Sequence, residues 1–231
     1  MDQLAFNTPI LNALGLGGLI HVWGNAGSGK TLFAVSLASD VSKYSRVEWI
    51  NTDAKKSFVA HLKKNVIESG GRMENITVTL TESRSELRGL IDDLPRTLVN
   101  TSLVIIDPIT RVLDMAREDP ILWGRELVEE VLPILTGIAS KTSIDIVIIS
   151  ESRMMENSKN QAVHHNSITR WIDHDLFLSR NMNGTQSQIF RMSENGLQEI
   201  AVMNLVSNGI LEVIPRLCVS ERLVEENERV W

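Results

Sequence analysis

Eight consecutive residues near the start of the chain have the types and spacing of a loop that binds phosphate groups. Residues 24–31 read Gly-Asn-Ala-Gly-Ser-Gly-Lys-Thr, so that two glycines lie five positions apart and lysine and threonine follow them. Backbone N–H groups hold the phosphates in such a loop, and larger side chains would block their approach. The pattern predicts nucleotide binding by Gly24, Asn25, Ala26, Gly27, Ser28, Gly29, Lys30 and Thr31.

The side chains at the end of this loop, and two aspartates further along, have separate expected roles. Lys30 would reach the β and γ phosphates of ATP, and the Thr31 hydroxyl would bind Mg²⁺. Asp107 follows an apolar run and either holds the same Mg²⁺ or caps the next helix. Asp53 follows an alternating, strand-like run and either polarises the attacking water or starts the next helix. We expect the metal role for Asp107 and the catalytic role for Asp53.

The segments around these residues predict an α/β fold. Apolar or alternating runs predict strands at 19–23, 46–51, 76–80, 103–106 and 145–150. Helical spacing predicts helices at 31–44, at 57–67, from 83 to Pro95, which should bend or end the helix, and from 119 onward. The predicted site residues then follow the carboxyl ends of strands, which is where open α/β sheets bind ligands.

The last third of the chain predicts antiparallel strands. Asn-Gly pairs at 183–184, 195–196 and 208–209 separate four further strand-like runs and supply the positive φ angles of tight hairpins. The expected architecture is therefore a mostly parallel central sheet flanked by helices and extended by C-terminal antiparallel strands. Residues 151–166, before these strands, are polar and show little periodicity, so we expect a mobile loop there.

Length and composition indicate one domain, expected at residues 1–218, followed by a charged tail at 219–231. The 231 residues are 43% hydrophobic and 23% charged, which are globular rather than disordered values. The net charge of −6 argues against tight nonspecific binding to nucleic acid, although a local basic patch would permit it. The single Cys218 excludes an internal disulfide framework and indicates the reducing cytoplasm. No apolar run has the length of a membrane span.

The histidines of the chain show no metal-binding pattern. His164 and His165 are adjacent and would point in different directions on a strand, whereas His21, His61 and His174 are scattered. A histidine metal site is therefore not expected. The five tryptophans lie mostly beside apolar runs, which favours core packing over base stacking.

The order of the motifs resembles the RecA-like ATPases, especially the archaeal RadA paralogues of the RadB kind and their KaiC-type relatives. The resemblance covers about residues 19–213, and its anchors are the phosphate loop, Asp107 and the segments 49–53, 148–153 and 208–210. It implies a RecA-like fold that hydrolyses ATP with Mg²⁺. It also implies homo- or hetero-oligomers, with single-stranded DNA and a recombinase or another protein as partners.

The resemblance also implies roles for three residues of the site. Asp53 stands where the family has its catalytic glutamate and is one methylene shorter. Glu151 stands where the family has a glutamine that senses the γ phosphate, and an ionised carboxylate there repels phosphate unless Mg²⁺, lysine or protonation compensates. Arg191 matches a basic residue that KaiC-type relatives extend to a neighbouring subunit's nucleotide. The departures at Asp53 and Glu151 from the family pattern predict slow hydrolysis of ATP.

We therefore expect an ATPase with an accessory role in DNA recombination or repair. The alternative is a KaiC-like switch or assembly ATPase that acts on protein partners without DNA, which the acidic net charge and Glu151 favour. Residues 151–166, at the position of the family's DNA-contacting loop, carry only Arg153 and Lys159 as full positive charges. A small-molecule kinase would need an arginine-rich lid, which the sequence lacks.

Overall fold

A nine-stranded sheet runs through the centre of the computed structural model, which describes residues 10–53, 56–110, 120–154, 160–194, 196–205 and 209–216. Its order is β11-β10-β9-β8-β1-β5-β4-β2-β3. Six neighbouring strands pair in parallel: β1 (Leu19–Gly24), β2 (Arg46–Asn51), β3 (Ile76–Leu80), β4 (Thr101–Asp107), β5 (Asp145–Ile149) and β8 (His174–Arg180). Three antiparallel strands extend the sheet beyond β8: β9 (Gln186–Ser193), β10 (Gly196–Leu205) and β11 (Leu211–Pro215). This arrangement confirms the expected fold class.

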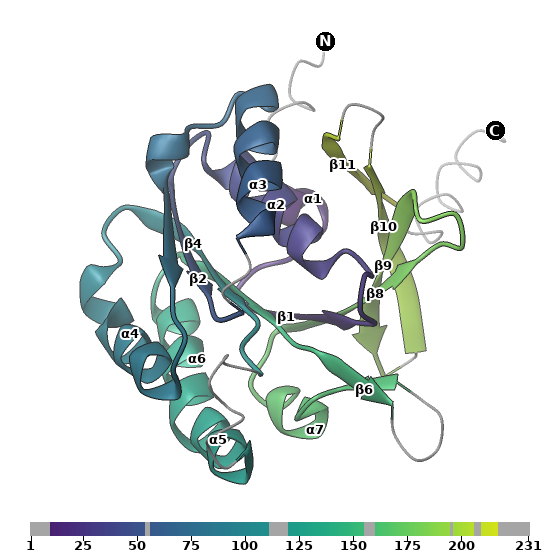
Figure 1. The fold of residues 1–231 in the computed structure, drawn as a ribbon. Helices are drawn as coiled ribbons and strands as arrows, with labels where there is room; N and C mark the ends of the chain where they lie inside the picture. Colours follow the sequence, from purple (N-terminus) through teal and green to yellow (C-terminus); the bar gives the residue numbers. More distant parts are fainter. Residues whose placement is uncertain are drawn as a thin grey trace, which may run out of the picture.

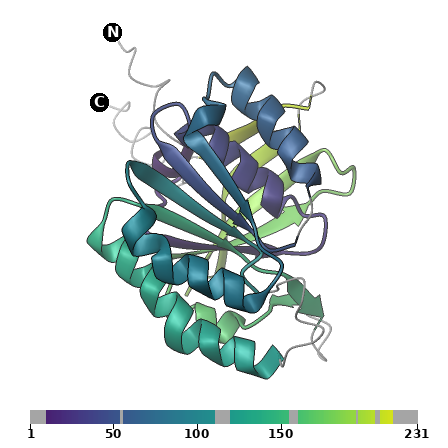
Figure 2. The same ribbon diagram turned by 60° about the vertical axis from the view of Figure 1, so that its left-hand side comes forward.

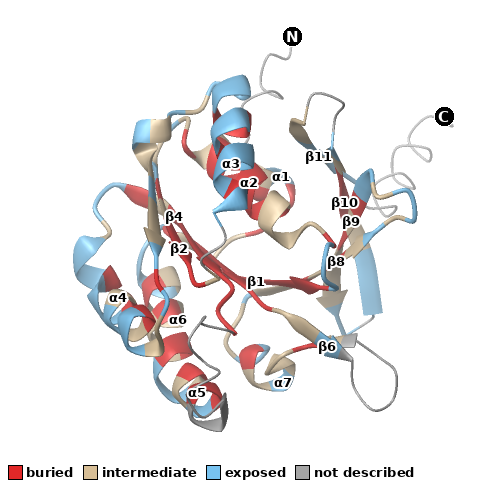
Figure 3. Cartoon of the chain, in the orientation of Figure 1, coloured by how far each residue is buried: buried red, intermediate tan, exposed pale blue. Residues whose placement is uncertain are grey.

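Helices cover the two faces of the sheet (Figures 1 and 2). The first face carries α1 (Ile10–Ala13), α2 (Lys30–Val41) and α3 (Ser57–Glu68), whose apolar residues form one core cluster with the sheet. The second face carries α4 (Arg84–Thr97), α5 (Pro120–Glu126), α6 (Leu132–Lys141) and α7 (His165–Ile168), which belong to a second cluster. Every residue of β1 is buried, as the central strands of Figure 3 show. A strand covered on both faces is mostly apolar, and His21 is the buried polar residue of β1.

Local sequence signals explain several element boundaries. The side chain of Ser83 caps α4 by accepting a hydrogen bond from the Glu86 N–H. Pro95 lies inside α4, which ends two residues later at Thr97. The proline has no N–H for the helical ladder, and few residues of the helix follow it. A π-helical turn at Leu127–Val131 joins α5 to α6.

The expectation of a loop at residues 151–166 is corrected by the structure. The segment contains two short antiparallel strands, β6 (Ser152–Met154) and β7 (Asn160–Ala162), followed by α7. Contacts from distant parts of the chain hold it, since the Ser152 hydroxyl donates to the Gly24 carbonyl at 2.9 Å. Such contacts leave no periodicity in the sequence. Residues 155–159 lie outside the described part, as do the predicted tail at 219–231 and Cys218.

Candidate nucleotide-binding site

The phosphate loop connects β1 to α2, as the glycine pattern predicts. Gly24, Gly27 and Gly29 all have positive φ angles, of 150°, 75° and 96°. A side chain at Gly24 would place its Cβ 2.2 Å from the Leu178 carbonyl oxygen of the neighbouring strand, so only glycine fits there. Gly29 begins α2 without a side-chain cap, which leaves the first N–H groups of the helix for an anion.

Lys30 lies folded back over this loop. Its Nζ donates hydrogen bonds to the carbonyl oxygens of Gly24 at 2.8 Å and Asn25 at 3.0 Å. Burial lowers the pKa of the Lys30 ammonium, and the negative charges of Asp107 and Glu151 oppose this shift. The ammonium therefore lies at the mouth of the loop, where phosphate oxygens would replace the two carbonyls as its acceptors.

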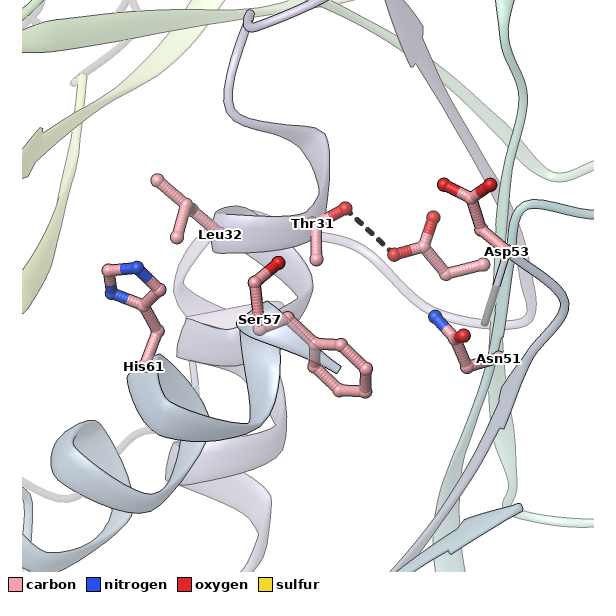
Figure 4. Close-up of a pocket in the computed structure, with 8 residues that line it drawn as sticks. Thr31, Leu32, Asn51, Asp53, Ser57 and His61 are labelled. Carbon is pink, nitrogen blue, oxygen red and sulfur yellow. Dashed lines mark hydrogen bonds between the residues drawn. The ribbon is translucent and has the colours of Figure 1, made fainter. Parts of the chain in front are cut away.

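Thr31 and Asp107 form the hydrogen-bonded pair at the centre of a cavity of about 230 Å³. The Thr31 hydroxyl donates to Asp107 Oδ2 at 2.8 Å, and Asp53 and Asn51 lie beside this pair (Figure 4). The Asn51 Oδ1 atom is buried without a hydrogen-bond partner. The Thr31 hydroxyl and the carboxylates of Asp107 and Asp53 are the oxygen ligands that Mg²⁺ prefers. The residues present therefore fit Mg²⁺.

A second cavity, of about 360 Å³, brings together residues that are far apart in the sequence. It lies beyond the carboxyl ends of β1, β4 and β5, as open α/β sheets require. The residues that line it include Gly27, Lys30, Thr31, Asp53, Asp107 and Glu151. The predicted phosphate, metal and catalytic residues therefore share one cavity.

Glu151 follows directly after β5 and the buried Ser150. Its backbone N–H donates to Thr110 Oγ1 at 3.1 Å, and its carbonyl oxygen accepts the Val163 N–H at 2.9 Å. Ser152, the next residue, bonds to the Gly24 carbonyl. Residue 151 is therefore fixed between the phosphate loop and the end of the β6–β7 hairpin.

Arg191 is not brought into this cavity. Its Nη2 donates to the carbonyl oxygens of Leu14 at 2.7 Å and Gly15 at 3.0 Å, within the same chain. Arg180 lies much closer to the loop, since its Nη1 donates to the Gly27 carbonyl at 3.1 Å. Sequence reasoning missed Arg180. The sequence shows only that Arg180 follows the strand-like run 175–179, because the pairing of β8 with β1 is known from the structure alone.

The comparison with solved structures finds a match that covers most of the chain. A crystal structure of the RadB recombinase superimposes with a TM-score of 0.68 at 20% sequence identity, over 89% of this chain and 96% of that one. The chain has the RecA-like fold of RadB. No protein-family model matches the chain, and no curated protein sequence matches it. The structural likeness therefore confirms the fold.

The described helices also bear on membrane association. None of them in the described ranges combines the length and the apolar character needed to cross a bilayer.

Proposed function

We propose that the protein binds Mg²⁺·ATP and hydrolyses it slowly. The observation that carries this proposal is the cavity of about 360 Å³, which is lined by the phosphate loop together with Asp107, Asp53 and Glu151. A loop of three positive-φ glycines that leads into a helix is suited to a chain of phosphates. The RecA-like fold supports the same reaction class.

Each residue of the cavity has a proposed role in this reaction. The loop N–H groups and Lys30 bind the phosphates, and Thr31 and Asp107 bind the metal. Mg²⁺ there would neutralise the charge that develops on the β and γ phosphates. Asp53 orients the attacking water, and it lines both the metal cavity and the phosphate cavity. Arg180 adds a positive charge beside the loop.

Slow turnover is proposed because two residues are poorly suited to fast hydrolysis. Asp53 has a side chain one methylene shorter than glutamate, which leaves it less reach toward a water molecule. Glu151 places a carboxylate in the cavity that would hold the γ phosphate, and like charges repel. Arg191 would serve a neighbouring subunit only after leaving the carbonyls of Leu14 and Gly15.

An accessory role in DNA recombination or repair is the biological setting that we propose, within an oligomer in the cytoplasm. The RecA-like fold of RadB supports it, and the domain would span residues 1–218. A nucleotide switch that acts on protein partners is the second candidate, since Glu151 lines the cavity and the net charge is −6. DNA contacts must weaken steeply with salt, whereas a switch of this kind needs no DNA.

Steady-state ATP hydrolysis, measured with and without single-stranded DNA at low and moderate salt, tests these proposals. Stimulation by DNA that fades with salt supports the recombination role, and ATP binding without any response to DNA supports the switch. The Lys30→Ala variant is the control, because it removes the charge that meets the β and γ phosphates. Turnover equal to wild type in Lys30→Ala would refute the site itself.

A further inference from the structure

Two histidines and an aspartate meet at a place that is separate from the nucleotide cavity. His21 lies on β1 and Asp175 lies directly beside it on β8, in paired register. His165 is the first residue of α7. Their neighbours Leu19 and Ile168 belong to the core cluster on the second face of the sheet, opposite α2. Three elements thus supply one side chain each to this cluster.

The carboxylate of Asp175 lies between the two imidazole rings. His21 Nδ1 is 2.8 Å from Asp175 Oδ1, and His165 Nε2 is 2.8 Å from Asp175 Oδ2. One possible ligand atom from each residue lies within 4.8 Å of the other two. The side chains are 0%, 13% and 11% exposed for His21, His165 and Asp175. In the described part of the chain, no other three His, Cys, Asp or Glu side chains converge in this way.

The remaining nitrogen of each ring is also held by a polar side chain. His21 Nε2 is hydrogen-bonded to Ser150 Oγ at 2.8 Å. His165 Nδ1 accepts from Gln161 Nε2 at 3.3 Å. Histidines that bind metals are also held through their second nitrogen, which fixes the ring orientation. Both rings therefore direct a nitrogen at the Asp175 carboxylate, one at each oxygen, while their far sides are held.

We propose that His21, His165 and Asp175 bind one Zn²⁺ ion. Two imidazoles and one carboxylate suit Zn²⁺, whereas Mg²⁺ and Ca²⁺ prefer oxygen ligands alone. Zinc bonds of about 2.0–2.1 Å at tetrahedral angles place neighbouring ligand atoms about 3.3 Å apart. Each ring nitrogen lies 2.8 Å from a different oxygen of Asp175, so an ion held by both rings and one of these oxygens requires the carboxylate to turn and the contacts to open by about 0.5 Å or more. When the ion binds, the neutral His21 ring carries its proton on Nε2, toward Ser150. The Gln161 amide must turn its oxygen toward His165 Nδ1, so that the neutral His165 ring carries its proton there.

Access to this site comes from the surface side of His165. A cavity of about 320 Å³ is lined by His165 and Gln161, together with Arg153, His164 and Asn166. A tetrahedral zinc with three protein ligands keeps its fourth position for water, and this cavity can supply that water. The ion would join α7 to β1 three residues before Gly24, where the phosphate loop begins.

Zinc titration of the full chain tests the proposal without any nucleotide. Protein freed of metal by a chelator is titrated with Zn²⁺ in excess Mg²⁺ by calorimetry, and we expect one zinc per chain. Co²⁺ in the same site should give the strong visible absorption of a tetrahedral centre with nitrogen ligands. At zinc concentrations about a hundred times Kd, the melting temperature should rise by roughly 5–10 °C.

Variants distinguish this site from adventitious binding. His165→Ala and Asp175→Asn should abolish stoichiometric binding, and Gln161→Ala should weaken it by about 10- to 100-fold. His174→Ala is the matched control, because residue 174 precedes Asp175 on β8 and its side chain points to the opposite face. It should bind zinc as tightly as wild type.

Two results would overturn the zinc site. The first is a wild-type protein that binds no zinc and shows no Co²⁺ absorption, which would leave Asp175 as a plain hydrogen-bond acceptor for two imidazoles. The second is unchanged binding in His165→Ala, which would move the zinc elsewhere. The wild-type Co²⁺ spectrum needs no substitution, so the test stands even where a variant folds poorly.

Discussion

Replacing Gly24 by alanine tests how closely the phosphate loop is packed against the sheet. Gly24 ends β1 at a φ of 150°, and an added Cβ would lie 2.2 Å from the Leu178 carbonyl oxygen and 2.9 Å from Ser28 Oγ. Cβ atoms in folded proteins do not approach other atoms within 3.0 Å, so the paired ends of β1 and β8 must separate. We expect a large loss of stability in the nucleotide-free protein.

Gly27→Ala is the matched control for this effect. Gly27 also has a positive φ, of 75°, but an added Cβ would meet no atom within 4 Å. Its cost is therefore the backbone conformation alone, about 1–2 kcal/mol. Gly24→Ala carries that cost and in addition a broken, buried backbone hydrogen bond, about 1–3 kcal/mol. The totals are about 2–5 kcal/mol for Gly24→Ala against about 1–2 kcal/mol for Gly27→Ala.

Urea denaturation followed by circular dichroism, with thermal melting as a second measure, gives both free energies of unfolding. At about 2–4 °C per kcal/mol for a chain of this size, the melting temperature should fall by roughly 2–8 °C for Gly27→Ala and 4–20 °C for Gly24→Ala. Both measurements exclude nucleotide, since each substitution also alters the loop that binds it. Equal losses in the two variants would refute the claim that the β8 backbone excludes a side chain at residue 24.

Four further substitutions test the site and the fold. Asp107→Asn should reduce Mg²⁺-dependent ATP binding, because it removes a carboxylate that faces the Thr31 hydroxyl. ATP binding in EDTA should stay close to wild type. Equal losses with and without Mg²⁺ would contradict the metal-binding role of Asp107. Asp53→Asn should preserve ATP binding and lower turnover, and unchanged turnover would make Asp53 only a helix start. Ser83→Ala should lower the free energy of unfolding by about 0.5–2 kcal/mol, because the Glu86 N–H loses its cap. Hydrogen bonds from the Glu82 backbone and the Thr81 hydroxyl lower the pKa of Glu86 from its usual 4.5. The contribution of Glu86 to folding stability is therefore present above pH 4.5 and is lost as the pH falls below it. A Glu86→Gln variant with an unchanged acid-unfolding curve would contradict this.

The fold class and the phosphate loop could be predicted because their signals are local. An apolar run at residues 103–106 identifies a strand buried on both faces, and the glycine spacing at 24–29 identifies the loop. Asp53 and Asp107 could be placed near the loop because parallel strands end at one edge of the sheet. These steps need only the order of the elements and no knowledge of their packing.

Features that depend on contacts between distant segments could not be predicted in the same way. His21 and Asp175 are 154 residues apart and meet only because β8 pairs with β1, a neighbour relation that the order of motifs does not state. The three-residue strands β6 and β7 are too short to show a period, and Ser152 holds one of them to the phosphate loop. Arg180 lies beside Gly27 for the same reason, since its strand pairs with β1.

The hydrogen bonds of Lys30 to its own loop affect how a ligand would be received. Ordering a free lysine side chain costs about 1.5–2 kcal/mol of conformational entropy. Because the Gly24 and Asn25 carbonyls already hold the ammonium, that loss is incurred when the chain folds. When a phosphate binds, the Lys30 ammonium exchanges two neutral carbonyl acceptors for charged phosphate oxygens, and no flexible side chain has to be ordered. The loop is therefore preorganised, and the affinity that its lysine can supply is reduced only by the strength of the two bonds that it gives up.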